Sequence, residues 1–262
     1  MRAHIVDRQN FFTWLLPSCI LAKNNNGRKR QIMNVNIELA SNLAKVQTAI
    51  ALSNLDSGRS KNSVTLIGVS KQQPNDRIEA VLSAGLRVFG ENRVQEAERR
   101  WTKRRKLFSD LELHLIGPLQ TNKARAAVRL FDVIQTVDRP RLAEALGRAM
   151  NEEEKNCVCY VQVNTGEEEQ KAGVSPKETP NFVATCIEEF GLNIAGLMCI
   201  PPANDAPAPH FAFLKQMADD LGLQNVSMGM SADYPIAVEL GATHVRVGSA
   251  IFGARHPLKS DS

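Results

Sequence analysis

The chain has 262 residues, of which 43% are hydrophobic and 23% are charged. This composition is typical of a soluble globular protein with a sizeable core, and it excludes a disordered or fibrous protein. The length admits one large domain or two small ones, so the domain count depends on the pattern of predicted elements.

The formal net charge of +4 is concentrated near the N-terminus. Residues 1–32 hold six basic side chains and one acidic one, so the remainder carries 26 basic and 27 acidic groups. A nearly neutral body gives no reason to expect a nucleic acid or an anionic membrane surface as a partner. We therefore expect neither.

The five cysteines are odd in number and show no paired CxxC spacing. That pattern indicates neither a disulfide framework nor a zinc site. We expect reduced thiols, no bound metal and a cytoplasmic location. The cysteines are Cys19, Cys157, Cys159, Cys186 and Cys199.

The N-terminal segment differs from the rest of the chain. Residues 11–22 form an apolar run of signal-peptide length that is too short to span a bilayer. The residues after this run, NNNGRKRQ, do not form a small-residue cleavage site. A targeting segment is one interpretation. We favour a second interpretation, in which Met33 is the true start of the protein. Residues 1–32 are then a translated leader, or an incorrectly assigned start, without a fixed structure.

Eight short apolar runs alternate with segments whose apolar residues recur at helical spacing. Repeated strand and helix units call for a parallel sheet, and eight of them predict a TIM-type (β/α)8 barrel. An open doubly wound sheet is the alternative fold. The runs are residues 64–70, 87–90, 113–117, 132–137, 157–164, 193–199, 225–229 and 244–248.

The barrel is expected to form one domain over residues 33–257, followed by a short tail at 258–262. An amphipathic pattern predicts an extra helix at about 34–55, packed outside the barrel. In such a barrel the chemistry lies at the carboxyl ends of the strands, so functional side chains are expected there.

The last two predicted strands run into glycine-rich turns, SMGMSAD and VRVGSAIFG. Backbone N–H groups at turns of this kind bind phosphate, and barrels commonly use the loops after strands seven and eight for this purpose. Each glycine taken alone could instead serve only a tight turn. Two adjacent turns of one type favour a phosphorylated ligand.

Lys71 directly follows the first predicted strand, in the sequence GVSKQQP. A lysine at a strand end is usually a solvated surface group. Opposite a phosphate site, a partly shielded amine is a Schiff-base candidate. A carbonyl and a phosphate in one ligand indicate either a sugar-phosphate aldolase or pyridoxal 5′-phosphate.

The chain resembles the pyridoxal phosphate homeostasis protein family, also called the YggS or PROSC family, from about Met33 to Arg255. The resemblance implies a single barrel of the alanine-racemase N-terminal type, with pyridoxal 5′-phosphate held as an aldimine on Lys71. It places the phosphate on Ser231 and on the turn of Gly248 and Ser249. The motifs that carry it are GVSKQQP, VFGENRVQEA, HLIGPLQTNK, QTVDRPRLA, NTGEEEQKAGV, GLMCIPP and SMGMSADYPIAVELGATHVRVGSAIFGAR.

The resemblance also implies weaker site assignments. Arg246 is expected to face the pyridine nitrogen, which would disfavour ring protonation, although a rim salt bridge is an alternative. Asn92 and Met198 are expected to line the cofactor, or else to cap a helix and to fill the core. We interpret His114 as a core histidine and Lys171 as a solvated rim charge.

The family often has a second basic residue two positions after the lysine, where this chain has Gln73. A role for basic rim charge in delivering the cofactor is therefore in doubt.

Three functions are compatible with a Schiff-base lysine. The first, which we favour, is a non-catalytic monomer that holds pyridoxal phosphate for vitamin B6 homeostasis, with apo forms of pyridoxal-phosphate enzymes as partners. The second is an amino-acid racemase, which needs a second base such as a tyrosine. Tyr160 lies within a predicted strand, Tyr234 starts a helix, and no second domain is expected to supply another. The third, a Schiff-base aldolase, has Glu91 as its nearby carboxylate. We assign no catalytic residue.

Overall fold

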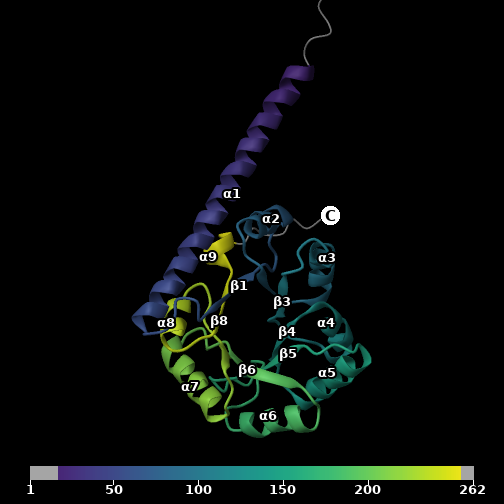
Figure 1. The fold of residues 1–262 in the computed structure, drawn as a ribbon, viewed down its shortest axis with the longest axis vertical. Helices are drawn as coiled ribbons and strands as arrows, with labels where there is room; N and C mark the ends of the chain where they lie inside the picture. The colour runs from purple at the N-terminus through teal and green to yellow at the C-terminus, as the bar shows by residue number, and fades with distance from the viewer. Residues whose placement is uncertain (1–16, 255–262) are drawn as a thin grey trace, which may run out of the picture.

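The computed structural model describes residues 17–254, with side chains described from Met33 onward. Eight parallel strands pair in chain order, and β8 pairs with β1 to close a barrel. Figure 1 shows helices arranged around the strands. The predicted barrel is confirmed, and the open doubly wound sheet is excluded because β1 has a partner on both sides.

The strands lie within or next to the predicted runs. They are β1 Thr65–Val69, β2 Val88–Glu91, β3 Glu112–Leu115, β4 Val133–Val137, β5 Val158–Val163, β6 Asn193–Cys199, β7 Asn225–Ser227 and β8 His244–Val247.

The helices follow the strands in alternation, after one helix that precedes the barrel. They are α1 Pro17–Asp56, α2 Asn75–Ser83, α3 Val94–Arg105, the 3-10 helix η1 Thr121–Lys123, α4 Ala124–Leu130, α5 Pro140–Glu152, α6 Thr179–Glu188, α7 Pro207–Asp220, α8 Tyr234–Glu239 and α9 Ser249–Phe252.

Helix α5 illustrates why these segments are helical. Pro140 lies in its first turn, where a proline costs no hydrogen bond. Leu142, Leu146 and Met150 follow at intervals of four, so they share one face, and all three are buried. The burial of this face holds the helix against the barrel.

Strand side chains alternate between two environments. Ile134 and Val245 belong to the large apolar core that includes residues of the surrounding helices. A second, much smaller apolar cluster consists of Val133, Tyr160 and Met198, which lie on the opposite face of their strands and therefore inside the barrel. Buried polar side chains take up other interior positions, and they include His114, Gln135, Ser227 and Arg246.

Helix α1 packs against the barrel through Leu39, Leu43, Val46 and Ile50, which are all buried. In Figure 1 it passes α8, α9 and α2 and then projects away from the barrel. It begins at Pro17, so the backbone of residues 17–32 is helical where the sequence predicted no fixed structure. The rest of the predicted leader, residues 1–16, lies outside the described residues.

The described part of the chain contains no helix with the length and apolar character needed to cross a membrane. Four of the cysteines have described side chains, and all four are buried free thiols. Burial raises the pKa of Cys186 and of Cys199 to about 12, so both are protonated at neutral pH.

Candidate functional site

The loop that carries Lys71 follows β1 and is held by helix α3. Arg100 Nη1 donates to the carbonyl of Ser70 at 3.0 Å, and Nη2 donates to the carbonyl of Gln73 at 3.1 Å. Between them, Gln72 has a φ of 60°, the left-handed region that a side chain rarely adopts. Arg100 therefore fixes the backbone on both sides of Lys71, whose own side chain is half-buried.

Glu91 ends β2 directly beneath this loop, and its side chain is fully buried. Its Oε1 accepts from Ser70 Oγ at 2.7 Å, from Arg100 Nη1 at 2.7 Å and from Trp101 Nε1 at 2.9 Å. A carboxylate held in this way by three donors is a structural anchor. The geometry therefore argues against Glu91 as the acid or base of an aldolase.

The turns after β7 and β8 meet at one hydroxyl. Ser231 Oγ accepts the backbone N–H of Gly248 at 3.1 Å and that of Ala250 at 3.3 Å. Gly229, in the first turn, has a φ of 86°, and a Cβ there would lie 2.5 Å from Ala237 Cβ. Close packing and two convergent N–H groups are the features expected of a phosphate-binding turn.

Closure of the barrel brings the second turn next to the lysine. Gly68 of β1 is the register partner of Val247 of β8. A Cβ built on Gly248 would lie 3.4 Å from Val69 Cβ, two residues before Lys71. The lysine loop and the phosphate turn are therefore neighbours at the carboxyl end of the barrel.

Arg246 points into the barrel and is only 4% exposed. Its Nη1 donates to Ser227 Oγ at 2.8 Å, and its Nη2 donates to the carbonyl of Cys199 at 2.8 Å. Burial lowers its pKa. The alternative assignment, a salt bridge on the rim, is wrong, because both of these partners are uncharged and buried.

The remaining predicted site residues lie around these groups. Asn92 is half-buried beside the lysine loop, and the residue that caps α3 is Arg93, so Asn92 is not a helix cap. Met198 is fully buried against Val133 and Tyr160, as a core methionine would be. Ser249 starts α9 and is exposed.

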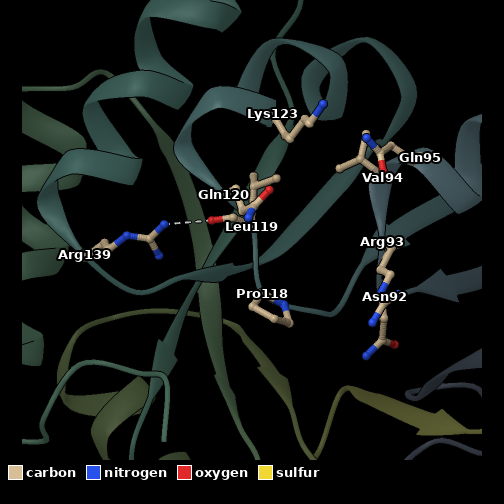
Figure 2. A pocket seen from close by; sticks show the side chains of 9 residues that line it. All are labelled: Asn92, Arg93, Val94, Gln95, Pro118, Leu119, Gln120, Lys123 and Arg139. Atoms are coloured by element: carbon tan, nitrogen blue, oxygen red, sulfur yellow. Dashed lines mark hydrogen bonds between the residues drawn. The ribbon is translucent and has the colours of Figure 1, made fainter.

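A cavity of about 770 Å³ opens over the ends of β2, β3 and β4. Figure 2 shows its lining residues, among them Asn92, Arg93, Lys123 and Arg139. Arg139 Nη2 donates to the carbonyl of Leu119 at 2.8 Å. The wall of this cavity therefore carries three cationic side chains, of which Arg139 is paired with Asp138 at 2.5 Å and Arg93 lies beside the lysine loop.

A second cavity, of about 490 Å³, lies beside the first and is lined by Lys71, Gln72 and Glu96 together with Asn92 and Arg93. Asn92 and Arg93 line both cavities. Ser231, Arg246, Gly248 and Met198 line neither. The structure thus groups the predicted residues in two neighbouring sets, one around Lys71 and one around the phosphate turn.

His114 has the environment expected of a core histidine, whereas Lys171 differs from the solvated charge that was expected. His114 is fully buried and hydrogen-bonded to Gln135 and Glu112. Lys171 is half-buried on the rim and forms an ion pair with Glu168 at 2.5 Å.

Arg100, Gln135 and Ser227 were not predicted from the sequence. Arg100 contacts the lysine loop and Ser227 contacts Arg246, whereas Gln135 contacts Ser227 and His114. A polar residue inside a predicted barrel strand is a usable signal for Gln135 and Ser227, because interior positions of such barrels are usually filled by bulky branched apolar side chains.

Comparison with known proteins identifies relatives of this chain. Residues 53–256 match the family model described as alanine racemase, N-terminal domain. The pyridoxal phosphate homeostasis protein of Aquifex aeolicus is 35% identical over 232 residues, which cover 85% of this chain and 99% of the relative. That of Escherichia coli K12 is 36% identical over 227 residues, which cover 83% and 97%.

Several solved structures share the fold of this chain. PipY of Synechococcus elongatus, solved without PLP, is 36% identical and superposes with a TM-score of 0.74, covering 82% of this chain and all of PipY. PipY with PLP bound is 35% identical and superposes with a TM-score of 0.70. Alanine racemase from Bartonella henselae is 14% identical with a TM-score of 0.65, covering 87% of this chain and 61% of the racemase, so it shows the shared fold alone.

Proposed function

Since the chain belongs to the pyridoxal phosphate homeostasis protein family, we propose that it binds pyridoxal 5′-phosphate covalently through Lys71 and serves intracellular vitamin B6 homeostasis. The observation that carries the proposal is the contact between the end of β1, which leads into Lys71, and the turn at Gly248, whose N–H groups converge on Ser231. This contact supports a site in which an amine and a phosphate-binding turn lie side by side.

The described residues fit this cofactor. When bound, pyridoxal phosphate supplies an aldehyde that condenses with a primary amine with loss of water, and a phosphate dianion that accepts hydrogen bonds. Lys71 supplies the amine. Ser231 Oγ accepts the N–H groups of Gly248 and Ala250 and keeps its own proton to donate. The hydroxyls of Ser231 and Ser249 and the turn at Gly248 are therefore assigned to the phosphate.

Arg246 is assigned to the ring nitrogen. Arginine has donors only and keeps its charge, so it cannot accept a proton from a pyridinium nitrogen. A guanidinium at that position favours the unprotonated ring, which is a weaker electron sink. Asn92 and Met198 are assigned to the walls of the site.

The cationic cavity wall supports an entry route for the phosphate. Arg93 and Lys123, with Arg139, lie over the ends of neighbouring strands. Positive charge around a cleft raises the local concentration of an anionic ligand. This feature offsets the absence of a basic side chain at Gln73, which is buried and therefore is not part of the rim.

A carrier role is favoured over racemase activity by the positions of the two tyrosines. Tyr160 is buried inside the barrel with its hydroxyl 3.3 Å from His244 Nε2, and burial raises its pKa well above the usual range. Tyr234 is half-buried, and burial raises its pKa as well. Neither phenol is poised as a base, and racemisation needs one opposite the lysine.

The binding experiment uses purified full-length protein mixed with pyridoxal phosphate. We expect a visible absorption band that borohydride removes, and mass spectrometry should place the reduced pyridoxyl group on Lys71. Lys71→Ala should lose the adduct and remain folded, because the residue lies in a loop beyond the strand. The matched control Lys177→Ala, at an exposed lysine that lines neither cavity, should keep the adduct. Labelling of a different lysine would contradict the assignment.

The carrier role is tested separately by deuterium exchange at the α-carbon of L- and D-amino acids with the cofactor at saturation. We expect exchange close to that of free pyridoxal phosphate, because a positioned second base contributes about two to four powers of ten. Exchange far above this level that is abolished in Lys71→Ala would make the protein an enzyme. Transfer to apo-enzymes is then measured as recovery of their activity.

A further inference from the structure

Arg246 is joined to the opposite face of the barrel by a continuous series of buried hydrogen bonds. Ser227 Oγ lies 2.8 Å from Arg246 Nη1 and 2.7 Å from Gln135 Oε1. Gln135 Nε2 lies 2.8 Å from His114 Nδ1, and His114 Nε2 lies 2.6 Å from Glu112 Oε1.

This series crosses the barrel from one end to the other. Arg246 is one residue from the carboxyl end of β8, where the proposed cofactor site lies, and Glu112 is the first residue of β3. Ser227, Gln135 and His114 are fully buried, whereas the side chain of Glu112 is 45% exposed. The charged ends are therefore a shielded guanidinium and a carboxylate that meets solvent.

The two ends determine the direction of every bond between them. A guanidinium can only donate, and a carboxylate can only accept. Ser227 accepts from Arg246, so its single hydroxyl proton goes to Gln135 Oε1. The amide nitrogen of Gln135 then donates to His114 Nδ1, which must carry no proton. His114 is consequently neutral, with its proton on Nε2 and donated to Glu112.

The opposite arrangement breaks the connection. Rotating the Gln135 amide by half a turn places an NH2 group against Ser227, which already accepts from Arg246, and leaves the hydroxyl proton without an acceptor. It also turns an oxygen towards His114 Nδ1, which then needs a proton on each ring nitrogen. A buried imidazolium is costly, and a buried unsatisfied hydroxyl is costly as well.

Titratable side chains lie next to His114. Among the described residues these are Glu112 on the same strand and His244 on β8, whose ring centroid lies 5.9 Å away. Burial lowers the pKa of His244 to about 4, so His244 adds no positive charge at neutral pH. The hydrogen bond from His114 lowers the pKa of Glu112, so the carboxylate stays ionised as an acceptor.

We propose that Gln135 and His114 are positioning residues for Arg246, acting through this one-way series of hydrogen bonds from Arg246 to Glu112. The role assigned to Arg246, facing the ring nitrogen, rests on the proposed function. The series holds the guanidinium in one orientation by fixing the proton of its acceptor, Ser227. Because each member can bond both neighbours in only one arrangement, a change at Gln135 reaches Arg246 without any contact between them.

The first measurement uses cofactor-free protein, so its outcome does not depend on the proposed function. Two-bond ¹H–¹⁵N correlation spectra of the histidine rings, assigned with a His114→Asn variant, report which nitrogen carries the proton. We expect neutral His114 with its proton on Nε2 at neutral pH. A proton on Nδ1, or on both nitrogens, would overturn the proposed series.

The second measurement breaks the series at two places. Gln135→Met keeps the volume but has neither a donor nor an acceptor, and Ser227→Ala is a small change that removes the hydroxyl. Each should shift the absorption band of bound pyridoxal phosphate and weaken its binding about tenfold, the loss expected for one hydrogen bond, while Glu112 keeps the His114 proton on Nε2. Should Gln135→Met not fold, Ser227→Ala alone decides.

The matched control is Thr136→Val, on the same strand. Thr136 is buried and donates to the carbonyl of Gly117 at 3.0 Å, outside the series. This variant loses one buried hydrogen bond and should keep the wild-type absorption band and cofactor affinity. If folded Ser227→Ala also keeps both, the positioning role is refuted. If wild-type protein fails to bind pyridoxal phosphate, the proposed function fails while the tautomer result stands.

Discussion

Arg100 and Glu91 form a buried ion pair, with 2.7 Å between Nη1 and Oε1, directly beneath the loop that carries Lys71. The Glu91 side chain is fully buried and that of Arg100 is 11% exposed. The same guanidinium holds the carbonyls of Ser70 and Gln73. The pair therefore links the stability of the barrel to the geometry of the lysine loop.

Removing one partner of this pair should destabilise the protein strongly. Arg100→Met leaves an uncompensated carboxylate at Glu91, so we expect the free energy of unfolding in urea to fall by about 3 to 5 kcal/mol. The double variant Arg100→Met/Glu91→Leu should recover part of this loss, because no buried charge is left alone. A single variant as stable as wild type would show that the pair has no structural role.

Gly229→Ala should damage both the fold and the phosphate turn. The φ of 86° disfavours any side chain, and the new Cβ would lie 2.5 Å from Ala237 Cβ. We expect a loss of about 3 kcal/mol from the two effects together, measured by urea unfolding. Gly222→Ala is the matched control, since it has a φ of 68° with no atom within 4 Å of a Cβ, and should cost about 1 kcal/mol. Equal losses would show that the close contact is unimportant.

His244 should make the protein less stable in acid. Its folded pKa of about 4 lies below the usual 6.5, chiefly because burial disfavours the imidazolium. Unfolded chains therefore bind more protons between these two values, and stability falls as the pH drops from about 6.5 through 4. The expected loss is on the order of 2 to 3 kcal/mol.

This pH dependence is measured as the free energy of unfolding in urea at a series of pH values. His244→Gln removes the titrating ring, so the slope between pH 4 and 6.5 should be shallower than in wild type. Glu112 contributes in the same direction, because its lowered pKa also removes stability as the pH falls. A wild-type slope in His244→Gln would assign the acid sensitivity to Glu112 and other carboxylates.

Residues 1–32 should be dispensable for folding and for cofactor binding. Among the described side chains of α1, the first fully buried one is Leu39, followed by Leu43, Val46 and Ile50. Protein expressed from Met33 keeps all four contacts with the barrel. We expect wild-type melting temperature and pyridoxal phosphate absorption. An insoluble product, or one that binds no cofactor, would show that the preceding segment belongs to the domain.

Local sequence patterns predicted most of the fold. The apolar runs placed the eight strands within one or two residues for most of their ends, because a strand buried on both faces must be apolar along its length. The helix before the barrel was placed at about 34–55, and the structure extends it back to Pro17. No apolar periodicity marks that extension.

The candidate site combines local and non-local features of the sequence. Lys71 at the end of a strand and the glycine turns after β7 and β8 are local features, so the sequence alone indicated an amine and a phosphate-binding turn. Their adjacency was decided only by closure of the barrel, because β1 and β8 lie at opposite ends of the domain and meet through the register of Gly68 with Val247.

The contact between the buried polar side chains could not be found from local patterns. Ser227 and Gln135 are each marked as polar residues inside a strand, but they are 92 residues apart in the chain, so no local pattern pairs them. Their hydrogen bond exists because β4 and β7 face each other across the barrel interior. The sequence determined which residues lie in each strand and at its end. Only the packed barrel decided which of these residues form hydrogen bonds with one another, because hydrogen bonding depends on distances of about 3 Å that no local pattern encodes.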